Sequence, residues 1–117
     1  PEQVNVGSED GLVSLEAVAR PAGSVEINRR DEIKEADGVM SPIYELAASD
    51  DAFVDDGEVT VHITNQDLDL TELDVYAYDL STLSWIALET SFDLAERTIS
   101  ATISFSGSVL VGVGLRL

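Results

Sequence analysis

Apolar and polar residues alternate along most of this chain, in short runs that Gly, Asp, Asn and Ser separate. The clearest run is EVTVHIT, in which Val59, Val61 and Ile63 occupy every second position and polar residues fill the positions between them. Successive side chains of a β-strand point to opposite faces, so this period of two predicts a strand with one buried face.

Other runs with the same pattern bring the predicted total to about nine strands. The clearest of them are GLVSLEAVA (11–19), SVEINR (24–29), SPIYELAA (41–48), LDVYAYD (73–79), SWIALET (84–90), TISATISF (98–105) and SVLVGVGLRL (108–117). In the last run Gly112 and Gly114 share the face opposite the valines, where another part of the chain could approach closely. Many short strands without a convincing amphipathic helix predict an all-β protein, an antiparallel β-sandwich with immunoglobulin-like architecture.

The length of 117 residues predicts a single domain over 1–117, because a chain of this size builds one hydrophobic core. The chain begins with Pro1 instead of methionine, so we expect it to be a piece excised from a larger protein. Its most apolar run, at the C-terminus, is interrupted by Gly112, Gly114 and Arg116 and is shorter than the roughly 20 residues of a membrane helix. We therefore expect no membrane insertion.

Acidic residues dominate the charge, with 23 Asp and Glu against 6 Lys and Arg and a formal net charge of -17. Such a protein repels the phosphates of nucleic acids, so we expect no nucleic-acid partner. Salt or bound cations would relieve the repulsion among its own carboxylates. The composition predicts an extracellular or cell-surface protein that is adapted to high salt or to cations.

Two acidic segments, SDDAFVDDGE (49–58) and NQDLDLTELD (65–74), lie between predicted strands, where we expect solvated loops, the second with a single helical turn. Calcium binds to carboxylate and carbonyl oxygens, and the first segment offers Asp50, Asp51, Asp55 and Asp56 as candidate ligands. Neither segment has the twelve-residue EF-hand spacing. A calcium site and a merely hydrated loop both stay open.

Three stretches, GLVSLEAVARPAGSVEI, SPIYELAASDDAFVDDGEVTVHI and VYAYDLSTLSWIAL, together resemble the ZU-type β-sandwich of ankyrins, netrin receptors and death-domain scaffold proteins. That family also has relatives in bacterial and archaeal surface proteins. The resemblance covers most of Gly11 to Leu115 and implies an ankyrin-ZU-like sandwich with Trp85 in its core.

Some members of that family cleave their own chain at a His-Phe-Ser sequence, where the serine hydroxyl attacks the preceding carbonyl. Phe105 and Ser106 match the motif, but Ser104 stands where the histidine would be. A serine nucleophile needs a base, and His62 belongs to a different strand pattern. We therefore expect Phe105 in the core and Ser106 on the polar face, with a degenerate autoproteolytic domain as the remote alternative.

The aromatic residues Tyr44, Tyr76, Tyr78 and Trp85 suggest either a carbohydrate-binding platform or part of the core, and the core is favoured. No cysteine is present, and paired carboxylates are expected by chance among so many acids, so we expect no enzyme. The sequence predicts a structural or protein-interaction module whose partner is another domain of the same chain or another protein. A calcium-dependent or carbohydrate-binding module is the alternative.

Overall fold

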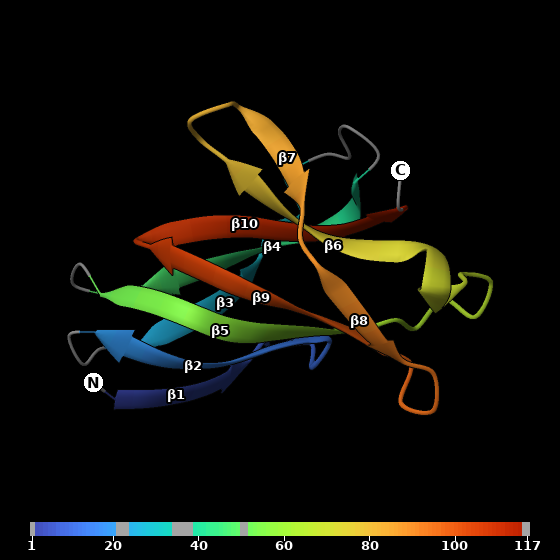
Figure 1. The fold of residues 1–117 in the computed structure, drawn as a ribbon, viewed down its shortest axis with the longest axis horizontal. Coiled ribbons are helices and arrows are strands. Elements are labelled where there is room, and N and C mark those ends of the chain that lie inside the picture. The colour runs from blue at the N-terminus through green and yellow to red at the C-terminus, as the bar shows by residue number, and fades with distance from the viewer. Residues whose placement is uncertain (1, 21–23, 34–38, 50–51, 116–117) are drawn as a thin grey trace.

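The computed structural model describes residues 2–20, 24–33, 39–49 and 52–115, which form two antiparallel sheets of five strands each (Figure 1). The first sheet has the spatial order β1 (Glu2–Gly7), β2 (Val13–Arg20), β5 (Phe53–His62), β9 (Thr98–Ser106) and β8 (Thr90–Asp93). The second sheet has the order β3 (Val25–Arg29), β4 (Val39–Ala48), β10 (Ser108–Leu115), β6 (Leu73–Asp79) and β7 (Ser84–Ala87). The predicted all-β antiparallel sandwich is confirmed.

The core between the sheets consists of the residues that the alternating pattern places on one face. Leu15 of β2, Val59 of β5 and Ile99 of β9 have no exposed surface. Leu46 of β4 and Val75 of β6 cover them from the second sheet and are equally buried. The predicted inward faces of EVTVHIT and TISATISF are both confirmed, since all their inward residues are buried.

Strand β5 is longer than its pattern predicts, because the acidic stretch before EVTVHIT also pairs within the sheet. Val54 pairs with Phe105 of β9 and is fully buried, although Asp55 and Asp56 follow it. These two aspartates form a β-bulge, and Asp56 has a positive φ of 50°. Both aspartates are exposed at the bulge, and the strand continues beyond them. The prediction of a loop at Asp55 and Asp56 is therefore wrong.

Gly57 follows the bulge and allows β5 to lie close to β2. A Cβ atom at this position would be 3.0 Å from the Ala17 Cβ and 3.0 Å from the Val54 Cγ1. Few Cβ atoms have contacts this short, so an added side chain would require Ala17 and Val54 to shift by a few tenths of an ångström. The sequence DDG is therefore a bulge followed by a tight strand contact.

The second sheet also carries a small apolar cluster on its outer face. Val39, Ile43 and Tyr76 are buried there, and Trp85 and Leu110 pack against them. Tyr76 pairs with Gly112, and its hydroxyl donates a 2.7 Å hydrogen bond to the backbone oxygen of Leu115. The face on which Gly112 and Gly114 lie is thus buried, partly by a tyrosine of the neighbouring strand.

The helical content of the described residues is a single 3-10 turn, Leu70–Glu72, as predicted for the second acidic segment. The Asp69 side chain caps it by accepting a hydrogen bond from the Thr71 amide. The connection that follows β3 contains a turn at 31–32, and 34–38 lie outside the described residues. Within the described ranges, no helix has the length and hydrophobicity needed to cross a membrane.

Candidate binding groove between the sheets

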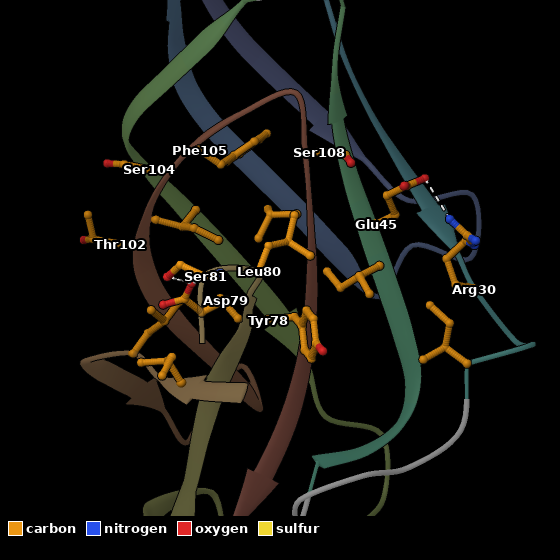
Figure 2. A pocket seen from close by; sticks show the side chains of 17 residues that line it. Arg30, Glu45, Tyr78, Asp79, Leu80, Ser81, Thr102, Ser104, Phe105 and Ser108 are labelled. Carbon is orange, nitrogen blue, oxygen red and sulfur yellow. Dashed lines mark hydrogen bonds and ion pairs between the residues drawn. The ribbon is translucent and has the colours of Figure 1, made fainter. Parts of the chain in front are cut away.

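The chain passes from the first sheet to the second where β9 continues into β10. These strands are consecutive in the chain and belong to different sheets, so the turn at Gly107 forms an arch from one sheet to the other (Figures 1 and 2). Strand β8 pairs with β9 only from Thr98 to Ala101. In the second sheet, β6 pairs with β10 only from Val111 onward. Both sheets therefore lack one neighbouring strand beside this arch within the described residues.

The space beside the arch is a groove with a volume of about 600 Å³, within the usual range of ligand pockets. Its apolar lining includes Ala77, Ile86, Leu88, Phe105 and Val109. Figure 2 shows Phe105 pointing inward under the arch, while the Ser104 and Thr102 side chains point away from it. The groove thus has an apolar floor, and β9, β10 and the β6–β7 hairpin form its walls.

The backbone of β9 presents hydrogen-bonding groups to this groove. The Ile63 amide donates to the Arg97 carbonyl at 2.8 Å, so Arg97 directs its backbone groups toward the side of β5. Every second residue of β9, counted from Arg97, then directs its backbone groups toward β5 as well. Backbone groups of an antiparallel strand alternate between its two neighbours, so Thr102 and Ser104 face the side that β8 has left. The last pair between β8 and β9 is Thr90–Ala101, so among the described residues Ser104 has no paired strand on that side.

Charged side chains surround the groove. Arg30 pairs with Glu45 at 3.2 Å on one side, as the dashed line in Figure 2 shows, and Asp79 lies on the β6–β7 hairpin. Hydrogen bonds from the Ser81 hydroxyl and the Ser81 amide lower the pKa of Asp79, so it is ionised at neutral pH. Because Arg30 is neutralised by its acidic neighbours, the charge that remains at this rim is negative.

The chain crosses between the sheets at the end of the groove opposite Gly107. The Leu88 amide donates to the Val75 carbonyl at 2.8 Å, just beyond the last pair of β7. The Thr90 hydroxyl accepts a hydrogen bond from the Val75 amide and donates to the Leu88 carbonyl. This crossover leads from β7 into β8 and fixes the position at which β8 starts.

The other side of the sandwich, here called the closed side, is held by a polar network around Asp10. The Asp10 carboxylate accepts hydrogen bonds from the Ser8 hydroxyl and the Tyr44 hydroxyl, both at 2.6 Å, and from the Leu12 amide at 3.0 Å. Arg29 contacts it at 3.4 Å. These contacts tie the turn between β1 and β2 to strands of the second sheet.

The same network determines the pKa values of its members. Burial alone would raise the pKa of the Asp10 carboxyl, but the hydrogen bonds from Ser8, Tyr44, Leu12 and Arg29 outweigh it and lower the pKa to about 2. Burial, and then the hydrogen bond to Asp10, raise the pKa of the Tyr44 hydroxyl. Asp10 is thus a carboxylate and Tyr44 its hydrogen-bond donor at all ordinary pH values.

The candidate calcium ligands occupy different situations. Asp50 and Asp51 lie outside the described residues. Asp55 and Asp56 are exposed at the bulge of β5, where the Ser104 hydroxyl donates to Asp55 at 3.3 Å and accepts from the Asp56 amide at 2.9 Å. The described part of the chain contains no group of three or more His, Asp or Glu side chains placed to hold a metal ion. A calcium site at this segment stays a prediction.

The second acidic segment has mainly structural contacts. Asp69 accepts hydrogen bonds from the Thr71 hydroxyl and the Thr71 amide, which lower its pKa. Asp74 lies in β6 and is buried. These acids therefore cap a turn and belong to a strand, and they do not gather around one point.

Phe105 and Ser106 lie as the strand pattern predicts, with Phe105 buried in the core and Ser106 exposed at the end of β9. His62, the one histidine of the chain, pairs with Thr98 at the opposite end of β9. Eight residues of strand separate Thr98 from Ser106, a distance of about 26 Å. His62 is therefore too far away to activate the Ser106 hydroxyl in this arrangement.

The four aromatic residues do not form one exposed platform. Tyr44 and Tyr76 are buried, which confirms the prediction that they belong to the core. Tyr78 and Trp85 are half-buried and pack edge to face, with ring centroids 5.3 Å apart. Trp85 thus lies at the margin of the outer cluster of the second sheet instead of in the main core.

No protein-family model matches this chain, and neither a curated protein nor a solved structure matches it at a significant level. The resemblance to the ZU-type sandwich stays a prediction.

Sequence reasoning missed the groove because none of its residues has a distinctive local motif. In the sequence, Thr102 and Val109 are ordinary positions of two strands in which apolar and polar residues alternate. The structure shows the cause as a difference in length, because the four-residue strand β8 lies beside the nine-residue strand β9, and β8 was not recognised from the sequence. Only the pairing register shows which part of β9 is left uncovered.

Proposed function

We propose that this domain is a non-enzymatic protein-interaction module of a larger secreted or cell-surface protein. The observation that carries the proposal is the groove beside the β9–β10 arch, which combines an apolar floor with uncovered strand backbone. Exposed sheet edges are the positions at which proteins pair with other chains. A domain that only separated its neighbours would not need such a groove.

The charge supports the same proposal. A net charge of -17 keeps copies of the domain apart at low ionic strength and favours partners with positive charge. Exposed carboxylates also suit a protein that works in salt, because screening relieves their repulsion. The partner is then another domain of the same protein or a separate protein.

The test is a selection of random short peptides displayed on phage, with the purified domain as bait. Ile86→Asp places a charge on the groove wall, at a side chain that is 43% exposed. Phe92→Asp is the matched control, since Phe92 is 45% exposed on the edge strand β8 and does not line the groove. Both variants add the same charge at edge positions of similar exposure.

We expect selected peptides to bind Ile86→Asp about tenfold more weakly than the wild type, and to bind Phe92→Asp as well as the wild type. Selection and binding are carried out at physiological salt, to suppress non-specific attraction to the acidic surface. The proposal would be overturned if no peptide is enriched, or if both variants weaken binding equally.

A further inference from the structure

We infer that the groove binds an extended polypeptide segment as an added β-strand, paired with residues 102–106 of β9 and lying in line with β8. This inference rests on the proposed function and specifies its mode of binding. Adding a strand to a free sheet edge is a common way to recognise extended peptides, with affinity from backbone hydrogen bonds and specificity from side-chain pockets.

The uncovered part of β9 sets the length of the segment. Strand β8 stops at the pair Thr90–Ala101, and β9 continues for five residues to Ser106. Five residues of strand span about 16 Å. The amides and carbonyls of Thr102 and Ser104 face this space, so an added strand would gain backbone hydrogen bonds at two alternate residues of β9.

The neighbouring side chains select which residues the segment carries. Residues directly opposite one another in paired strands share a face of the sheet. Positions opposite Ile103 and Phe105 would point toward the apolar floor, where Val109 and Leu88 also lie, and favour apolar side chains. Positions opposite Thr102 would lie on the solvent-exposed face and favour polar ones.

Charge further restricts the polar positions. On the outer face, Asp55 accepts a hydrogen bond from Ser104, and Asp79 lines the groove from the β6–β7 hairpin. Lysine or arginine at the outward positions of the segment would lie on the same face as Asp55, and the charge of Asp79 at the groove adds to the negative potential there. A second copy of this domain would bring another net charge of -17 to the same edge, which disfavours self-pairing. The structure thus points to a segment in which apolar and basic residues alternate.

The experiment uses the selected peptides and modifies their backbone. A peptide in a strand directs alternate amides toward β9, so two versions are made, each with N-methyl groups on one set of alternate residues of the central segment. The version that methylates the amides facing β9 should lose about tenfold or more in affinity, because it removes backbone hydrogen bonds. The other version should keep its affinity, and both are measured by isothermal titration calorimetry.

A second measurement replaces the basic residues of the peptide by glutamate, which should weaken binding by about tenfold at low salt and by less at high salt. Equal affinity of the two methylated versions for the wild type, with binding still lost in Ile86→Asp, would overturn strand addition while the proposed function stands. Tight binding of glutamate-substituted peptides would overturn the charge preference. If no groove-dependent peptide is selected at all, both proposals are overturned.

Discussion

The closed side and the groove side of this sandwich keep their sheets together by different means. On the closed side, the Asp10 carboxylate collects hydrogen bonds from Ser8, Leu12 and Tyr44 and so joins a turn of the first sheet to a strand of the second. On the groove side, the sheets are linked by the covalent turn at Gly107 and by the crossover at Thr90, with an apolar space between them. The difference shows that the fold can leave one side open because the other side and the central core hold it together.

Substitutions in the core and on the groove wall should differ most in the unfolding free energy that they cost. Leu15→Ala in the fully buried core should cost about 3 kcal/mol of unfolding free energy, through lost burial and the cavity left behind. Ile86→Ala on the groove wall should cost less than about 1 kcal/mol, because that side chain is already partly exposed. Urea unfolding followed by circular dichroism measures both, and equal losses would show that the open side is packed like the core.

A pair of tyrosine substitutions tests the strength of the closed side. Tyr44→Phe removes a hydrogen bond to the ionised Asp10 and should cost about 1–2 kcal/mol. Tyr76→Phe removes a hydrogen bond to the uncharged Leu115 carbonyl and should cost about 1 kcal/mol or less. The same urea experiment compares them, and a larger loss in Tyr76→Phe would argue against the Asp10 network as the main polar link.

The pH dependence of stability tests the same network. The pKa of Asp10 is about 2 in the folded protein and about 3.9 in an unfolded chain. A lowered folded pKa contributes stability that is present above about pH 4 and is lost as the pH falls toward about 2. After allowance for solvent screening, this contribution is about 1 kcal/mol.

Asp10→Asn should therefore be less stable than the wild type at neutral pH, and the difference should shrink as the pH falls toward about 2. Comparison of the two proteins removes the general effect of protonating the other acids. A difference that stays constant down to this pH would show that the Asp10 charge is not what stabilises the closed side.

The smallest expected effect concerns charge repulsion that acts on both sides. Glu16 of β2 lies directly opposite Glu58 of β5, and both are exposed. Glu16→Lys should raise stability by about 0.5 kcal/mol at low salt, and the gain should disappear in about 1 M KCl. Glu26→Lys changes the charge equally at an exposed residue opposite Ala47 and is the control. Equal gains in both variants would mean that only net charge matters.

Most of the fold follows from local sequence pattern. The strands with strict alternation, such as Thr98–Ser106, are predicted with the correct buried face, because their apolar residues are the ones that pack in the core. The strands that were not recognised separately are β1 and β8, which are short edge strands. In β8, Phe92 is nearly half exposed, so burial imposes little pattern on the sequence.

The site is harder to predict because it depends on register. The bulge at Asp55 and Asp56 has the sequence pattern of a loop, since two adjacent aspartates interrupt the alternation of apolar and polar residues even though the strand continues. The groove exists because β8 ends opposite Ala101 and β6 begins to pair with β10 at Val111. Those positions are set by contacts between residues far apart in the chain, and no single segment encodes them.

Site-resolved hydrogen exchange by NMR tests directly whether β9 has an uncovered edge in the free protein. The Ser100 amide faces β8 and should be protected, whereas the Ser104 amide, four residues further along the same edge and beyond the last pair of β8, should exchange about a hundredfold faster or more. Protection of Ser104 should then appear when a groove-binding peptide is added. If Ser104 is as strongly protected as Ser100 in the free protein, the edge is already covered and strand addition at β9 is contradicted.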